Sequence, residues 1–152
     1  MTVEGLRYVV DNSVAAKWSL KLSDEPHLPE ALQLLDDHRT GRVSLIAPSL
    51  LAYEQGSSLR AAARHRRIPQ DQATELLNRF FQLGIPLIYE EELLQRALEL
   101  SVQFGAGYAD SVYLALSEAS QCSLIHADQR LRNAIAGRFL DELWIGDYRS
   151  PI

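Results

Sequence analysis

The sequence of 152 residues has a single cysteine and no long apolar run. One cysteine excludes an intramolecular disulfide, and the apolar neighbours of Cys122 favour a buried, unreactive thiol of the kind found in reducing compartments. The apolar stretch in segment 1–13 is short and interrupted by Asp11, which argues against a signal peptide. No stretch approaches the length that spans a bilayer. We therefore expect a soluble, cytoplasmic protein with no membrane contact.

Positive charge is also scarce, with a formal net charge of −5. A negative chain is a poor general binder of phosphates, whose affinity comes from lysine and arginine. The hydrophobic share of 47% is normal and allows one packed domain over residues 1–152. The arginines are unevenly placed, however, and four of them form a cluster: Arg60, Arg64, Arg66 and Arg67. This cluster predicts either a solvated helix end or a basic rim that binds RNA.

Several chemistries lack their motifs. The chain has no His and Cys cluster with zinc spacing and no glycine-rich phosphate loop. The segment after Asp11 lacks the second aspartate of an aspartyl-phosphate phosphatase, and Ser13 has no nucleophile-elbow context. His126 ends an apolar stretch, which favours a packed histidine at the edge of the core over a general base.

Apolar stretches of strand character alternate with segments of helical periodicity. The predicted strands are 6–10, 43–47, 86–89, 123–126 and 143–145. The predicted helices are 14–20, 28–38, 48–66, 69–83, 94–101, 109–119 and 128–135. This alternation predicts an α/β fold, an open parallel sheet of four to five strands with helices on both faces. The functional crevice of such a sheet lies at the carboxyl ends of its strands.

Four acids stand where that crevice is expected. Asp11 directly follows the first predicted strand, and Asp128 lies two residues beyond the strand 123–126. Glu54 lies about two turns into its helix, and Asp110 lies in the first turn of another. Each also has a simpler interpretation, because aspartate favours helix N-termini and a helix glutamate is usually solvated.

Carboxylates that crowd together repel one another, which raises at least one of their pKa values. A Mg²⁺ or Mn²⁺ ion removes this cost because both ions prefer oxygen ligands. Such an ion supports hydrolysis of a phosphodiester. The acids therefore form a candidate metal site, with a carboxyl pKa above its ordinary value as the expected sign.

Four segments of the chain resemble, in order, the motifs of PIN domains, in particular of VapC-like toxins. They are VVDNSVAAKW (9–18), APSLLAYEQGSSL (47–59), YADSVYLALSEA (108–119) and LIHADQRL (124–131). The resemblance covers the chain from residue 8 to about 135. It implies a PIN-like fold and an endoribonuclease that depends on Mg²⁺ or Mn²⁺. It also implies a type II toxin–antitoxin system, in which a cognate antitoxin inhibits the enzyme, and a homodimer.

The resemblance assigns roles to individual residues. Asp11, Glu54, Asp110 and Asp128 match the family's metal-binding and catalytic acids, and Ser13 matches a supporting hydroxyl. His126 departs from the pattern, because the family usually has Thr or Ser there. The alternative is therefore a degenerate PIN-like module that binds RNA or protein without cleaving it.

Overall fold

The computed structural model describes residues 6–21, 24–139 and 141–151. These residues form a five-stranded sheet in which every paired strand runs parallel to its neighbour. The strands are β1 (Leu6–Val10), β2 (Val43–Pro48), β3 (Leu87–Ile88), β4 (Ser123–His126) and β5 (Glu142–Trp144). Their order across the sheet is β3-β2-β1-β4-β5. The predicted open parallel sheet is thus confirmed, with five strands.

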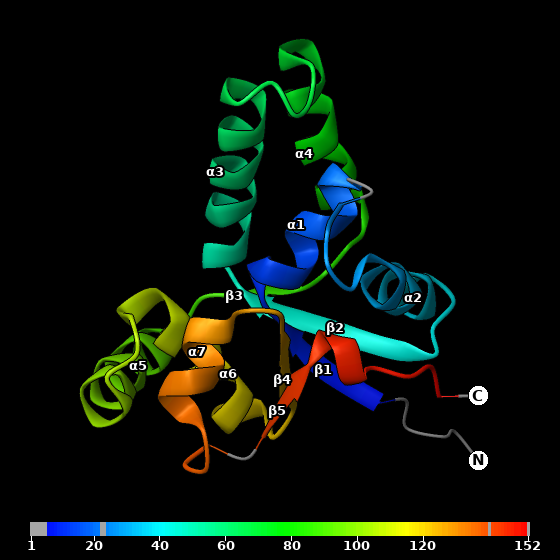
Figure 1. Cartoon of the computed structure of the whole chain (residues 1–152). Coiled ribbons are helices and arrows are strands. Elements are labelled where there is room, and N and C mark those ends of the chain that lie inside the picture. Colours follow the sequence, from blue (N-terminus) through cyan, green and yellow to red (C-terminus); the bar gives the residue numbers. More distant parts are fainter. Residues whose placement is uncertain (1–5, 22–23, 140, 152) are drawn as a thin grey trace.

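Helices cover both faces of this sheet (Figure 1). The α-helices are α1 (Asn12–Leu20), α2 (Leu28–Arg39), α3 (Leu50–Arg64), α4 (Ala73–Gln82), α5 (Glu91–Phe104), α6 (Tyr108–Ser120) and α7 (Gln129–Ile135). Helices α1 to α4 gather on one side of the sheet, and α5, α6 and α7 lie on the other (Figure 1). No helix of the described residues is long and apolar enough to cross a membrane.

The strand order reverses beside β1. The chain runs from β1 through β2 to β3, and then returns across the sheet to β4 on the other side of β1. At such a reversal the loops that follow the two neighbouring strands diverge to opposite faces, which opens a crevice at their carboxyl ends. The structure therefore has its crevice where β1 and β4 end.

The central strands are buried on both faces, as parallel strands between helices require. Val9, Val10, Leu124 and Ile125 are all 0% exposed. These apolar side chains fix β1 against β4 in the register Val9↔Leu124 and Val10↔Ile125. The position at which each strand ends is therefore set by packing.

One helix begins later than its sequence pattern predicts. Pro69 was expected to open the helix 69–83, but residues 70–72 form a 3₁₀ turn and α4 follows at Ala73. Proline presets a backbone φ near −65°, which suits this tighter turn as well as an α-helix. The predicted apolar face, which includes Phe80, lies within α4.

The C-terminal segment is tied to α2 by a buried carboxylate. Asp37 is 0% exposed and accepts hydrogen bonds from Tyr148 Oη, Ser150 Oγ, Gln33 Nε2 and Arg42 Nη1. Burial raises the pKa of Asp37, but these hydrogen bonds outweigh burial, so the pKa lies below its ordinary value. Asp37 lies just before the start of β2, at the edge of the sheet opposite the crevice, so the network is structural.

Candidate metal-dependent active site

Asp11 lies directly after β1 and is 5% exposed. Its backbone N–H donates to Ile125 O at 3.0 Å, which continues the pairing with β4. Its Oδ2 accepts hydrogen bonds from the backbone N–H and the hydroxyl of Ser13, so Asp11 is also the N-cap of α1. The cap fixes the direction of the carboxylate and occupies one of its oxygens.

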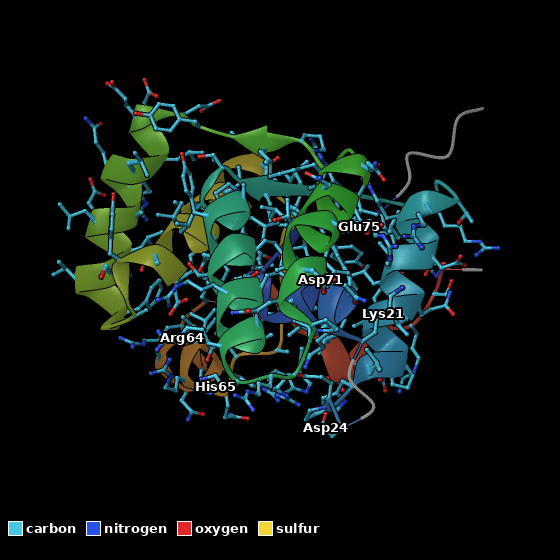
Figure 2. All side chains as sticks on the ribbon, turned by 90° about the horizontal axis from the view of Figure 1, so that it is seen from above. Lys21, Asp24, Arg64, His65, Asp71 and Glu75 are labelled. Carbon is cyan, nitrogen blue, oxygen red and sulfur yellow. The ribbon has the colours of Figure 1, made fainter. Side chains whose placement is uncertain are left out.

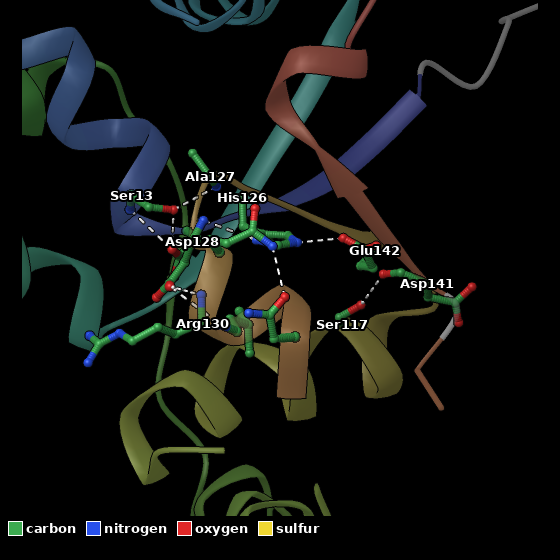
Figure 3. Close-up of polar contacts among 12 residues, drawn as sticks. Ser13, Ser117, His126, Ala127, Asp128, Arg130, Asp141 and Glu142 are labelled. Carbon is green, nitrogen blue, oxygen red and sulfur yellow. Dashed lines mark hydrogen bonds and ion pairs between the residues drawn. The ribbon is translucent and has the colours of Figure 1, made fainter. Parts of the chain in front are cut away.

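Asp128 occupies the corresponding place after β4. Its Oδ1 accepts the backbone N–H groups of Arg130 at 3.0 Å and Leu131 at 3.3 Å, which makes Asp128 the N-cap of α7. The Ser13 hydroxyl accepts the backbone N–H of Ala127 at 2.9 Å while it donates to Asp11 (Figure 3). Ser13 thus bridges the two loops that leave β1 and β4.

Glu54 and Asp110 approach the same edge from the two helical layers. Helix α3 follows β2 and so begins at the carboxyl edge of the sheet, with Glu54 in its second turn. Helix α6 runs back toward the start of β4, and its first turn, which holds Asp110, therefore lies at that edge too. The buried hydroxyl of Tyr113, one turn beyond Asp110, donates a hydrogen bond to Glu54 Oε1.

Three of these carboxyl groups have raised pKa values. Burial is the largest cause for each, and it raises the pKa of Asp11 to about 6 against the hydrogen bonds from Ser13. Repulsion adds to burial: Asp11 is raised by Glu54 and Asp110, and Glu54 by Asp110. The pKa of Asp110 is raised by burial and then by Asp128. The carboxyl pKa values are raised as expected. Burial raises them more than repulsion between the carboxylates does.

The carboxylates have the chemistry of a hard-cation site. Asp11, Glu54 and Asp128 each have one oxygen held by protein donors, and the other receives no hydrogen bond from the described residues. Open, oriented carboxylate oxygens are the ligands that Mg²⁺ and Mn²⁺ prefer. Within the described ranges, however, no three Asp, Glu, His or Cys side chains lie close enough together to hold one ion. The carboxylate oxygens are therefore suitable ligands for such an ion, but the side chains would have to move closer together to bind it.

A buried amide network fixes α3 against α1. Gln55, which is 0% exposed, donates from Nε2 to Asn12 Oδ1 at 2.9 Å and accepts from Ser19 Oγ at 2.9 Å. Asn12 Nδ2 donates in turn to Ser58 Oγ at 3.0 Å. Because Asn12 follows Asp11 and Gln55 follows Glu54, the network sets the position of one acid relative to the other.

Neither Tyr113 nor Gln55 is among the site residues that the sequence predicts. Tyr113 lies three residues after Asp110 on a predicted helix, so its place one turn along the same face was a usable signal. Gln55 offered none, since a glutamine in a helix is ordinarily solvated and its partners are 36 and 43 residues away.

The arginine cluster lies at the far end of α3, away from the crevice. Arg64 follows Glu54 by ten residues in the same helix, which places it about 15 Å along the axis. Figure 2 looks down on the hairpin of α3 and α4, with Arg64 and His65 at the end of α3. A polar hollow of about 600 Å³ is lined there by Arg64, Arg66 and Arg67, and Arg67 pairs with Asp24 at 2.9 Å. The four arginines therefore do not form a rim around the acids. They form a separate basic tip at the end of the α3–α4 hairpin.

Arg130 is a cation close to the acids. A hollow of about 320 Å³ is lined by Gly105, Gly107, Asp110 and Arg130, among others. The charge of Arg130 lowers the pKa of Asp110, although burial and Asp128 together keep it raised. On another side, an apolar cavity of about 240 Å³ has Tyr53 and Tyr108 in its lining. Of the four acids, Asp110 lines the hollow beside Arg130, and its neighbour Ala109 lines the apolar cavity.

Two solved structures share this fold at low sequence identity. One is a toxin–antitoxin complex from Klebsiella pneumoniae, with a TM-score of 0.59 and 15% identity, covering 90% of this chain and 95% of that one. Another is PAE2754 from Pyrobaculum aerophilum, with a TM-score of 0.64 and 19% identity, covering 93% and 92%. A search of curated proteins found no significant match. The family model of the PIN domain matches residues 8–136. The chain therefore belongs to the PIN domain family, whose members are generally nucleases that use divalent metal ions.

Proposed function

We propose that this chain is a divalent-metal-dependent endoribonuclease, a VapC-like toxin that hydrolyses RNA phosphodiester bonds. The observation that carries the proposal is the convergence of four acids from four segments on the crevice where β1 and β4 end. Three of them have a raised pKa, which is the mark of a functional carboxyl cluster more often than of a solvated surface.

Each of the four acids would contribute a carboxylate ligand to Mg²⁺ or Mn²⁺. Asp11 is oriented by Ser13, Glu54 by Tyr113, and Asp128 by the N-terminus of α7. Asp110 lies in α6, on the other side of the sheet from Glu54 in α3, and completes the proposed ligand set. The ion would supply Lewis acidity to the scissile phosphodiester and to the attacking water. The protein's part is to keep these oxygens pointed inward before substrate arrives.

RNA is held at two places in this proposal. Arg130 lies beside Asp110 and can neutralise a phosphate next to the scissile bond. The basic tip of Arg60, Arg64, Arg66 and Arg67 binds phosphates farther along the strand, and its Arg64 lies about 15 Å from Glu54 along the helix axis. Arg67 contributes less than the other three because Asp24 already pairs with it.

The partners follow from the family. We propose a cognate antitoxin as the inhibitor and a homodimer as the active assembly. A neighbour of the same fold is described as a toxin–antitoxin complex, which supports the first part. Copurification with the product of an adjacent small gene tests the antitoxin, and light scattering of the purified chain tests the dimer.

The alternative is a PIN-like module that binds RNA or protein without cleaving it. The separation of the acids beyond ligating range favours this alternative. His126 does not favour the alternative. Its ring accepts the backbone N–H of Asp128, and the Asp128 carboxylate keeps its place at the start of α7.

Cleavage of RNA with Mg²⁺ or Mn²⁺ against an EDTA control decides between the two. Asp11→Asn and Asp110→Asn should each abolish cleavage while the circular dichroism spectrum of the fold is kept. Full activity in either variant, or activity in EDTA, would exclude the proposed site. Binding of RNA without any cleavage by the wild type would establish the alternative.

A further inference from the structure

His126, the last residue of β4, is 0% exposed and uses both ring nitrogens. Nδ1 accepts the backbone N–H of Asp128 at 3.3 Å, and Nε2 lies 2.5 Å from Glu142 Oε2 (Figure 3). Because a backbone N–H can only donate, Nδ1 carries no proton. The ring proton therefore sits on Nε2 and is donated to the carboxylate of Glu142.

The imidazole is locked in this orientation by β5. Strand β5 pairs with β4 in the register His126↔Trp144, and the Trp144 ring packs edge-on against His126 with centroids 5.7 Å apart. The guanidinium of Arg132 lies over the Trp144 ring, 5.1 Å from the ring centroid. Glu142 and Trp144 together leave the histidine one hydrogen-bonding arrangement.

A buried histidine and a glutamate partner are costly in a strand that is otherwise apolar. An aliphatic residue after Leu124 and Ile125 would continue the core without any polar group to satisfy. The polar pair does one thing that an aliphatic residue cannot: it accepts the backbone N–H of Asp128. The loop 126–128 is then held at both sides, by His126 here and by Ser13 at Ala127.

This loop determines where the Asp128 carboxylate points. With its backbone N–H fixed and its Oδ1 engaged by the start of α7, Asp128 has only Oδ2 left to turn toward the crevice. We propose that His126 and Glu142 are positioning residues, which act through Asp128 to set the affinity of the acid site for a divalent cation. This inference rests on the proposed function.

Two substitutions of His126 separate its two contacts. His126→Asn places an amide oxygen near the position of Nδ1 and so keeps an acceptor for Asp128. His126→Gln reaches Glu142 instead and leaves the Asp128 N–H without its acceptor. We expect His126→Gln to weaken Mn²⁺ binding by about tenfold or more, as loss of a supporting group around a metal site does. His126→Asn should stay within about threefold of the wild type.

Glu142→Leu offers a second route if His126→Gln does not fold. It removes the acceptor of Nε2–H at similar side-chain volume, so the ring is free to change its tautomer. We expect weaker Mn²⁺ binding from this variant, whereas Glu142→Gln, which keeps an acceptor oxygen, should bind like the wild type.

The decisive measurement is Mn²⁺ affinity by isothermal titration, repeated in an Asp128→Asn background. If His126 acts through Asp128, His126→Gln should cause no further loss there. An equal loss in both backgrounds, or equal losses for the Asn and Gln variants, would overturn the positioning role.

The ¹⁵N shifts of the His126 ring provide an independent readout in the wild-type chain. An unprotonated Nδ1 supports the contact with Asp128, and a proton on Nδ1 refutes it whether or not the chain binds metal. Absence of Mn²⁺ binding in the wild type, with an unprotonated Nδ1, would refute the metal site and with it the effect on cation affinity, while the contact of His126 with Asp128 would stand.

Discussion

The carboxyl group of Asp11 is buried where β1 ends, and burial raises its pKa to about 6. In the unfolded chain the pKa of an aspartate is about 4. The folded, metal-free protein therefore holds this proton more tightly than the unfolded chain does. Its stability falls as the pH rises from about 4 through 6, and the whole cost is present above that range.

Replacement of Asp11 by Asn should remove this dependence. The amide keeps an oxygen that accepts the hydrogen bonds from Ser13 but does not ionise. In EDTA, we expect the free energy of unfolding of Asp11→Asn to rise relative to wild type by on the order of 2–3 kcal/mol between pH 4 and 7.5. Urea unfolding at several pH values measures this difference. Parallel curves for the two proteins would show that Asp11 does not titrate in this range.

At this scale, the sequence was informative for some residues and silent for others. Asp11 and Asp128 follow predicted strands, so their meeting at the crevice could be anticipated. The role of Glu142 in holding the Asp128 loop could not be anticipated. Glu142 is 16 residues from His126 and contacts it only because β4 pairs with β5. Local patterns do not encode such contacts.

Helices α1 and α3 meet through the polar network around Gln55, although most helix contacts in this fold are apolar. A buried polar network specifies one relative placement of its helices, because only that placement satisfies every donor and acceptor. The placement matters here since each helix carries one of the acids, Asp11 at its cap and Glu54 within it.

Gln55→Met should therefore loosen the site and the fold together. Methionine is similar in size but leaves Asn12 Oδ1 and Ser19 Oγ without their partner. We expect a loss of about 1–3 kcal/mol in the free energy of unfolding, and weaker Mn²⁺ binding. The control is Ser57→Ala on the exposed side of α3, which should change stability by less than about 0.5 kcal/mol. Unchanged Mn²⁺ affinity in Gln55→Met would show that the network serves stability alone.

The tip of the α3–α4 hairpin should contribute to RNA affinity without taking part in cleavage. Replacing Arg60, Arg64 and Arg66 by Gln removes three exposed cations. We expect weaker RNA binding and a salt dependence whose slope falls by about 2–3, since fewer counterions are released. Cleavage at saturating RNA should be retained. Arg79→Gln, on α4 and paired with Glu75, is the control. An unchanged slope would make the cluster a solvated helix end.

Periodicity predicted the elements well because most are long or deeply buried. Edge strands β3 and β5 have only two and three residues, yet β-forming residues between turn signals indicated both. The boundary at Pro69 was the weaker point, since proline suits a 3₁₀ turn and an α-helix equally.

The order of the strands decides where the whole molecule can place a site. Alternation of strands and helices predicts a parallel sheet, but several strand orders satisfy it, because pairing joins residues far apart in the chain. The order β3-β2-β1-β4-β5 puts the reversal between β1 and β4. The acids lie together because they are at the crevice that this reversal opens. The acids come from the end of β1, from α3, from α6 and from the loop before α7, so a ligand that joins them links segments from residue 11 to residue 128.

A divalent ion should for this reason stabilise the entire fold. Ion at a hundred times its dissociation constant adds about 2.7 kcal/mol to the free energy of unfolding when only the folded site binds it. For a chain of this size, the melting temperature should rise by roughly 5–11 °C. Melting curves with Mn²⁺ and with EDTA at pH 7.5 measure the shift.

The shift should depend on the crevice and on nothing else in the molecule. Asp11→Asn should lose most of it, since the variant lacks one ligand charge and has already shed the cost of burying it. Asp71→Asn, which removes an exposed acid from the 3₁₀ turn before α4, should keep the full shift. If Mn²⁺ raised the melting temperature of Asp11→Asn as much as that of the wild type, the ion would bind elsewhere. The acids would then be two helix caps, Asp11 and Asp128, and two helix residues, Glu54 and Asp110, around a crevice without a metal.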